Sequence, residues 1–116
     1  MNWTAVAAIL LALAVAIGAF GAHGLRGRLD AYSMDIYERA VLYHFIHALG
    51  LLIVSTLPRP SQLVCWLLLT GIILFSGSLY ILAVTGIKTL GAVTPFGGLS
   101  FIAAWILLAI SAARKS

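Results

Sequence analysis

Apolar residues dominate the chain in four long stretches that contain no Asp, Glu, Lys or Arg. These stretches cover residues 1–25, 40–58, 60–87 and 89–113 of the 116-residue sequence. Each reaches the roughly 18 residues that mark a candidate membrane span. The pattern predicts helices at about residues 3–22, 34–57, 62–84 and 89–113, and it leaves no room for a separate soluble domain.

The connections between these predicted helices indicate how they are arranged. A Pro-Arg-Pro sequence at 58–60 ends the second helix, and residues 85–88 separate the third from the fourth. Links this short place consecutive helices side by side in opposite directions. We therefore expect an all-α membrane protein with four transmembrane helices in an up-down bundle, formed by residues 1–116 as a single membrane domain.

The longest polar connection, at residues 23–36, predicts a short segment at the membrane surface. Apolar residues recur there every three or four positions, as on one edge of an interfacial helix, at Leu25, Leu29, Tyr32 and Ile36. Gly27 interrupts the pattern, so a short or irregular helix is expected. We expect Ser33 to cap the second span, with Asp35 and Glu38 in its first turns, where negative charge suits the helix dipole.

Pro95 allows two starts for the fourth helix. The helix either begins near Thr89 and kinks at Pro95, or it is capped by Thr94 and has Pro95 as its first residue, a position that tolerates proline. Both alternatives end the helix near residue 113.

The first predicted helix carries small residues in two rows with four-residue spacing. The rows are Ala8–Ala12–Ala16 and Ala14–Gly18–Ala22. Because small residues let membrane helices approach closely, we expect this helix to be packed on more than one side. Its apolar stretch exceeds a typical signal-peptide core and has no Lys or Arg ahead of it, which predicts a retained span.

Composition supports a membrane chain and argues against other classes. Hydrophobic residues make up 63% of the sequence and charged residues 9%, against roughly a quarter charged in a soluble domain. The net charge of +4 is scattered over loops and ends without a basic stripe, so we expect the lipid bilayer, and no nucleic acid, as a partner. The single cysteine, Cys65, excludes an internal disulfide and is expected to be a small buried residue.

Basic residues lie at both ends of the predicted bundle. One end is flanked by Arg26, Arg28, Arg39 and Lys88, and the end with both termini by Arg59, Arg114 and Lys115. Cytoplasmic loops carry an excess of basic residues, so this count favours both termini outside. A count so close to balance also fits insertion in both orientations, followed by antiparallel dimerisation.

Two histidines lie inside the second apolar stretch. They share one helix face with other residues spaced by three or four, namely Tyr37, Ala40, His44, His47 and Leu51. At about 1.5 Å per residue, His44 lies about 10 Å and His47 about 15 Å beyond Tyr37, toward the middle of a hydrocarbon core about 30 Å thick. Small residues at Ala40 and Ala48 suit helix contact, so we expect both histidines to face the bundle.

We call the polar residues expected around these histidines the polar seam. Its members are His23, Glu38, Tyr43, His44, His47, Ser76 and Ser78. An antiparallel hairpin places His23 on the side of the membrane where the second helix begins, nearer the height of Tyr37 than of His47. Ser76, Ser78 and Tyr80 are the candidate hydrogen-bond partners on the third helix.

Three interpretations of the polar seam stay open. In the first, neutral histidines bond across helices in a non-enzymatic membrane component that packs against another membrane protein or another copy. In the second, an oligomeric transporter or channel moves a proton-coupled small solute, because histidine titrates near neutral pH, although no carboxylate lies deep in a span. In the third, His44 and His47 bind a metal with His23, although the heights differ and one helix face cannot clamp a haem. We expect no cofactor.

No catalytic constellation is visible, so we do not expect an enzyme. Glycines at 18, 21 and 24 imitate part of a dinucleotide signature, but they follow a membrane helix instead of opening a helix after a strand. We expect the glycines of these segments to allow close helix packing, at Gly18, Gly21, Gly24, Gly77, Gly97 and Gly98.

Four motifs follow one another along nearly the whole chain. They are GAFGAHGL at 18–25, YxxAxxYHxxHxLxLL at 37–52, FSGSLY at 75–80, and TPFGG at 94–98 with Trp105 eight residues past Gly97. The sequence resembles domain-of-unknown-function family 423, small membrane proteins related to transmembrane protein 256. The resemblance implies a four-span protein of the bacterial inner membrane with no assigned activity. By resemblance only, it marks as site candidates Gly21, His23, Gly24, Tyr43, His44, His47, Ser76, Gly77, Pro95, Gly97 and Gly98.

Overall fold

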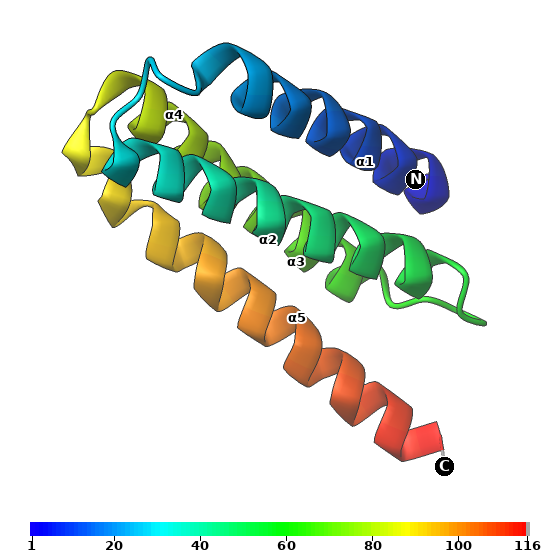
Figure 1. The fold of residues 1–116 in the computed structure, drawn as a ribbon. Helices are drawn as coiled ribbons and strands as arrows, with labels where there is room; N and C mark the ends of the chain where they lie inside the picture. The colour runs from blue at the N-terminus through cyan, green and yellow to red at the C-terminus, as the bar shows by residue number, and fades with distance from the viewer. Residues whose placement is uncertain (116) are drawn as a thin grey trace.

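The computed structural model describes residues 1–115, and the chain is built from helices (Figure 1). In chain order they are α1 (Trp3–Phe20), the π-helical turn η1 (Gly21–Leu25), α2 (Ala31–Ser55), α3 (Gln62–Gly71), the π-helical η2 (Ile72–Gly77), α4 (Ser78–Thr85), the 3₁₀ helix η3 (Lys88–Ala92) and α5 (Thr94–Lys115). Four continuous units are long and apolar enough to cross a membrane, at Trp3–Leu25, Ala31–Ser55, Gln62–Thr85 and Lys88–Arg114. The predicted class, an all-α membrane protein with four spans, is confirmed.

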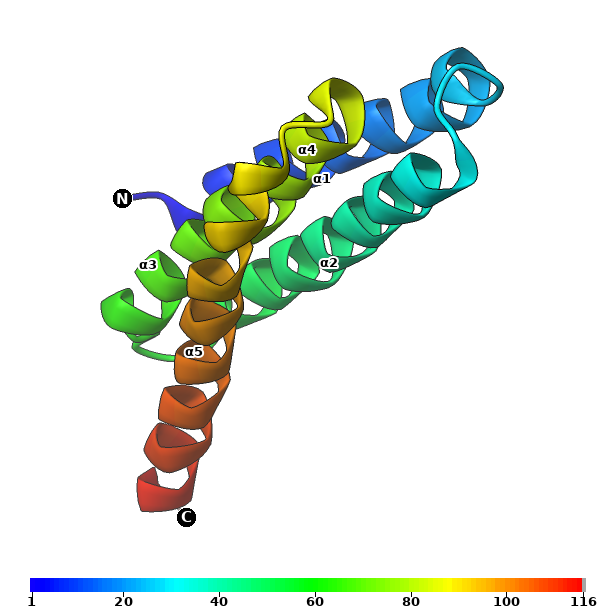
Figure 2. The ribbon, with the colours of Figure 1, turned by 90° about the vertical axis from the view of Figure 1, so that its left-hand side faces the viewer.

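Helix α2 is the central element of the bundle. It contacts α1 on one side and α3, η2 and α4 on the other, while α5 packs against α3 and η2. Both termini lie at the same end of the elongated molecule (Figure 1). Seen after a quarter turn, α5 diverges from the other helices as it approaches its C-terminal end (Figure 2).

The core divides into two apolar clusters along the bundle. The cluster toward the termini is centred on Leu51, Leu68 and Phe101, and the cluster at the other end includes Tyr37 and Leu79. Many large apolar side chains point outward with more than half of their surface exposed, among them Ile9, Ile53, Ile73, Phe96 and Ile102. A water-soluble monomer rarely exposes so much apolar surface, so these side chains face lipid.

Helix α1 packs within the chain along one face only. Ala14 is buried and Gly18 is half-buried against Val41 of α2, while Ala8 and Ala12 of the other small-residue row are exposed. Within the chain α1 therefore packs on one side, and a contact on a second side stays a prediction. Helix α2 is its main neighbour, and the start of α1 also contacts α3, where Trp3 packs on Trp66 and donates to Gln62 at 2.8 Å.

The link between the first two spans contains no separate interfacial helix. The helix of α1 continues through η1 to Leu25, and the chain turns at Gly27, whose φ of +88° is in the left-handed region that glycine adopts without strain. Helix α2 begins at Ala31, and its cap is Asp30, whose carboxylate accepts the N–H of Ser33 at 2.7 Å. The predicted Ser33 cap is wrong, because Asp30 caps the helix three residues earlier and Ser33 lies inside its first turn.

The other helix ends are close to those predicted. Helix α2 stops at Ser55, where the hydroxyl groups of Ser55 and Thr56 bond back to carbonyl oxygens of the last turn. Helix α5 starts at Thr94, so Pro95 lies in its first turn and does not kink a longer helix. The Thr94 hydroxyl bonds the Ser78 hydroxyl at 2.6 Å instead of capping its own helix. Ser116 lies outside the described residues.

The third span contains a π-helical segment in its middle. The prediction had one regular helix at 62–84, but η2 interrupts the α-helical pattern at Ile72–Gly77. This segment is where α5 approaches most closely, since a Cβ atom placed on Gly97 would overlap the backbone nitrogen of Phe75. Because π-helical turns are rare and often mark functional sites, η2 directs attention to the residues around it.

Candidate functional site

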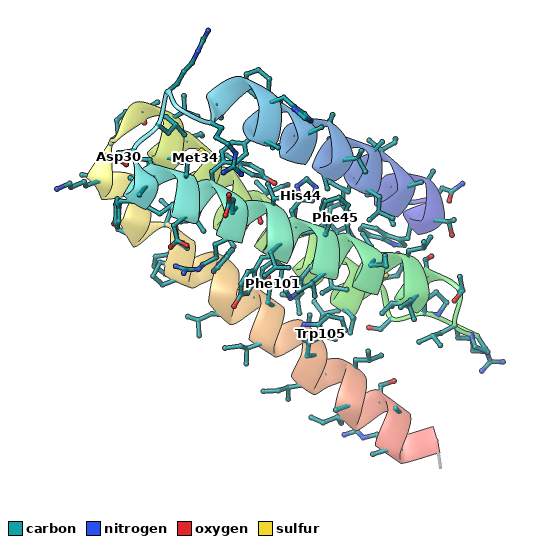
Figure 3. The ribbon with its side chains drawn as sticks, viewed as in Figure 1. Asp30, Met34, His44, Phe45, Phe101 and Trp105 are labelled. Atoms are coloured by element: carbon teal, nitrogen blue, oxygen red, sulfur yellow. The ribbon has the colours of Figure 1, made fainter. Side chains whose placement is uncertain are left out.

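His44 and His47 lie in the interior of the bundle, on the inward face of α2. Only 3% of the His44 surface and 6% of the His47 surface are exposed. The two side chains diverge from α2, because His44 lies between α1 and α2 while Phe101 and Trp105, which pack against His47, come from α5 (Figure 3). The two rings therefore contact different neighbours.

His44 bonds to the third span. Its Nδ1 atom lies 2.7 Å from the hydroxyl oxygen of Tyr80 on α4. Its Nε2 atom is buried and has no hydrogen-bond partner among the described residues. The backbone of Leu10 on α1 faces the ring, but not in hydrogen-bonding geometry. Buried polar atoms almost always have a hydrogen-bond partner, so this unpaired nitrogen is unusual for the interior of a bundle.

His47 is enclosed by aromatic side chains. Its ring stacks on Phe101 with 3.5 Å between ring centroids and 11° between ring planes, and Trp105 lies 5.7 Å away. The Nδ1 atom lies 2.8 Å from the carbonyl oxygen of Tyr43, which can only accept, so Nδ1 carries the hydrogen and Nε2 is unprotonated in the neutral ring. The His47 ring thus packs between α2 and α5 as an aromatic side chain would.

Tyr43, Ser76 and Ser78 line the same region without bonding either histidine through their side chains. Tyr43 packs on Phe75 with ring centroids 4.5 Å apart. Ser76 is fully buried and donates to the carbonyl oxygen of Ala40 at 2.8 Å. Ser78 donates to the carbonyl oxygen of Phe75 at 3.0 Å. Among the three predicted partners on the third span, only Tyr80 bonds a histidine, because the serine hydroxyls reach backbone carbonyls first.

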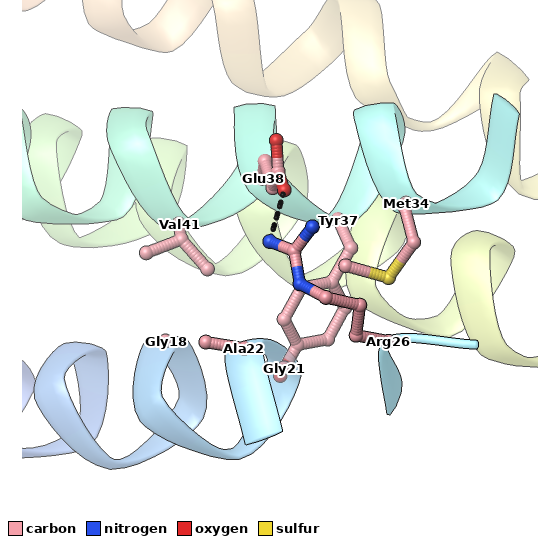
Figure 4. Close-up of a pocket in the computed structure, with 8 residues that line it drawn as sticks. All are labelled: Gly18, Gly21, Ala22, Arg26, Met34, Tyr37, Glu38 and Val41. Carbon is pink, nitrogen blue, oxygen red and sulfur yellow. Dashed lines mark ion pairs between the residues drawn. The ribbon is translucent and has the colours of Figure 1, made fainter. Parts of the chain in front are cut away.

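His23 and Glu38 lie apart from the buried histidines. His23 is exposed at the end of the first span. The Glu38 side chain, 59% exposed, pairs with Arg26 at 3.6 Å on the rim of a small pocket of about 130 Å³ (Figure 4). The ring of Tyr37 lies over Gly21 in this pocket, and its hydroxyl donates to the Ile17 carbonyl oxygen at 2.5 Å. The predicted polar seam is therefore not one continuous group, because His44, His47, Ser76 and Ser78 are buried whereas His23 and Glu38 are exposed.

The structure does not assemble a metal site from the polar seam. Within residues 1–115, no group of three or more His, Cys, Asp or Glu side chains comes together. His23 is on the surface, whereas His44 and His47 are buried and point to different helices. The three-histidine ligand set considered from the sequence is therefore not formed.

The glycines around the histidines differ in how tightly they are packed. A Cβ atom on Gly21 or Gly97 would overlap Tyr37 or Phe75, whereas one on Gly98 would meet its nearest atom only at 3.9 Å and one on Gly77 would meet nothing within 4 Å. A Cβ atom on Gly24 or Gly18 would press on Phe20 at 2.9 Å or on Val41 at 3.2 Å. The predicted set of packing glycines is therefore heterogeneous.

Sequence reasoning missed the aromatic residues that α5 contributes to the site. Phe101 packs over Gly71, and Trp105 packs over Gly50, where an added Cβ atom would lie 2.6 Å from the indole ring. A usable signal was present, because Phe101 and Trp105 are four residues apart and share one helix face.

The motifs that build this site also connect the chain to known sequences. The family model described as "Protein of unknown function (DUF423)" matches residues 17–98, from the end of α1 to the first turn of α5. The chain belongs to the DUF423 family. The resemblance inferred from the four motifs is thereby confirmed, and the matched region includes His44, His47 and Tyr80.

Curated relatives of this DUF423 chain are bacterial membrane proteins. A UPF0382 membrane protein of Staphylococcus haemolyticus is 48% identical over 108 residues, covering 90% of this chain and 88% of the relative. A UPF0382 membrane protein of Bacillus subtilis is 46% identical over 113 residues, covering 92% of each. No solved structure matches the chain. With its four spans, the DUF423 chain is an integral, multi-pass protein of the bacterial inner membrane.

Proposed function

We propose that this DUF423 protein is a non-enzymatic membrane component in which His44 and His47 join the helices of the bundle. It acts by contact with another membrane protein or with a second copy of itself. The observation that carries the proposal is that both rings are engaged inside the chain, His44 by Tyr80 and His47 by Tyr43 and Phe101.

The two contacts supply a useful part of the stability of a small bundle. An interhelical hydrogen bond in a membrane contributes about 0.6 kcal/mol on average and about 1.7 kcal/mol at most. A stacked aromatic pair contributes about 0.5–1.5 kcal/mol. Together the His44 bond to α4 and the His47 stack on α5 are expected to contribute about 1–3 kcal/mol, against a typical total of about 5–15 kcal/mol.

The outward face of α1 supports a contact with a further helix. Small residues recur along this exposed face at intervals of three or four, at Ala5, Ala8, Ala12, Ala16 and Ala19. A face that contacts only lipid does not require small residues. Small residues on a membrane helix allow another helix to approach closely. This face is therefore the expected contact with the partner.

The proposal is tested by stability, flux and partner measurements on the same variants. His44→Ala and His47→Ala should each lower thermal stability in detergent, while vesicles with the parent protein show no solute or proton flux. Leu42→Ala, at an exposed position of α2, is the matched control and should leave stability nearly unchanged. Affinity purification in mild detergent should recover a specific companion protein or a homo-oligomer. A monomer without a companion would contradict the partner part of the proposal.

A second candidate, an oligomeric transporter or channel for a proton-coupled small solute, is favoured by one observation. The buried Nε2 atom of His44 has no hydrogen-bond partner among the described residues, so it is available to a proton or a passing polar solute. In this case His44→Ala would fold as stably as the parent and would abolish a flux that the parent shows in vesicles. Loss of the parent's flux in His44→Ala, without a change in thermal stability, would favour the transporter.

A further inference from the structure

The end of the bundle that holds both termini is open beside α5. Helix α5 diverges there from the other helices (Figures 1 and 2). The resulting groove has a volume of about 350 Å³ and lies between α5 and the start of α3. We call it the α5 groove, and its lining residues are Ser61, Leu63, Leu107, Ile110, Ser111 and Arg114.

The lining of the α5 groove combines an apolar wall with a polar rim. Leu63, Leu107 and Ile110 form the wall, and Ile110 is 44% exposed. In a bilayer, an apolar groove between diverging helices is occupied by an acyl chain unless protein covers it, because water is excluded from this depth. Two hydroxyl groups and the exposed guanidinium of Arg114 complete the rim.

The charge distribution selects the kind of lipid. All three acidic residues of the chain, Asp30, Asp35 and Glu38, lie at the opposite end of the bundle. The two ion pairs formed by the described side chains, Arg26–Glu38 and Arg39–Asp35, lie there as well. Among the described side chains, no carboxylate pairs with Arg114 at the groove. The first turn of α3, which begins after Ser61, adds the positive end of a helix dipole.

We propose that the α5 groove binds one anionic phospholipid. The headgroup phosphate lies at Arg114 with the hydroxyl groups of Ser61 and Ser111, and an acyl chain lies along Leu63, Leu107 and Ile110. Basic pockets between membrane helices bind anionic headgroups in this way. The site is separate from the buried histidines and from the outward face of α1, so it stands or falls independently of the proposed function.

The test is native mass spectrometry of the full chain, released from detergent micelles that contain equimolar phosphatidylglycerol and phosphatidylcholine of the same acyl composition. The parent should retain one phosphatidylglycerol in preference to phosphatidylcholine. Arg114→Gln should reduce this preference about fivefold, the effect of one basic residue near an anionic lipid. Arg28→Gln is the matched control, because Arg28 is exposed at the opposite end and lines no part of the groove.

A second variant tests the acyl-chain wall. Ile110→Trp fills the groove without changing charge, so it should reduce retention of both lipids, and circular dichroism should show unchanged helicity. Three results would overturn the proposal. They are equal retention of the two lipids by the parent, equal losses in Arg28→Gln and Arg114→Gln, and full displacement of the lipid by glycerol 3-phosphate, which carries the phosphate without an acyl chain. Retention of another protein at this face in place of lipid would overturn it as well.

Discussion

Replacement of Gly97 by alanine tests the close contact between α5 and the backbone of η2. Gly97 is buried in the first turn of α5, where it packs directly on the backbone of η2. A Cβ atom at this position would overlap the backbone nitrogen of Phe75. Backbone cannot rotate away as a side chain can, so α5 must move outward as a whole.

The magnitude follows from two opposing effects. Overpacking of a close contact costs about 1–3 kcal/mol. Alanine in place of glycine within a helix returns about 0.8–1 kcal/mol. Gly97→Ala should therefore lower the free energy of unfolding by up to about 2 kcal/mol. Gly98→Ala is the neighbouring control, because its Cβ atom would meet Phe75 at an ordinary distance of 3.9 Å, so only the gain in helix propensity applies.

Both variants should be unfolded with SDS in mixed micelles and followed by far-UV circular dichroism. The expected order of stability is Gly98→Ala, then the parent, then Gly97→Ala. The stack of Phe101 on His47 should also loosen in Gly97→Ala. Near-UV circular dichroism of the aromatic residues would detect this change. A Gly97→Ala variant as stable as Gly98→Ala would refute the close approach of α5 to η2.

Three further predictions concern single side chains. Cys65 is fully buried, so a maleimide should label it only after SDS unfolding; rapid labelling of the folded protein would contradict this burial. Ser76→Ala should lower stability by about 0.6 kcal/mol, because the bond to the Ala40 carbonyl oxygen is lost, and an unchanged unfolding curve would exclude that bond. Hydrogen bonds from Ser33 lower the pKa of Asp30 below 3.8, mainly the bond from its backbone N–H and to a smaller extent the bond from its hydroxyl group. The Asp30 contribution to stability is therefore complete above about pH 4 and is lost as pH falls through the lower, folded-state pKa. Asp30→Asn should abolish this part of the acid dependence in an unfolding titration, and an unchanged acid dependence would contradict it.

The four spans were predictable because a helix that crosses lipid needs a long apolar stretch with almost no charged residues. Charges are absent from the four apolar stretches, and helices in the structure lie where these stretches are. The ends were less predictable, because they depend on which polar group reaches a backbone N–H first. Asp30 and Ser33 are both good caps, and only the turn at Gly27 decides that Asp30 precedes the helix.

The site was predictable only as far as one helix determines it. The spacing of His44 and His47 showed that both face inward, since this follows from the geometry of α2 alone. Their partners depend on how the helices are rotated against one another. The π-helical turn η2 contributes to that rotation within the third span, and no feature of the sequence marked it. Tyr80 and Phe101 could therefore not be assigned to their histidines from spacing.

A double-mutant cycle between His44 and Tyr80 tests most directly whether buried histidines join the helices. Tyr80→Phe removes only the hydroxyl group that lies 2.7 Å from His44 Nδ1, and His44→Leu removes the ring nitrogens. Unfolding in mixed micelles should give a coupling free energy of about 0.6–1.7 kcal/mol between the two changes. Strictly additive effects would show that the two side chains do not stabilise the bundle through each other, and would contradict the account.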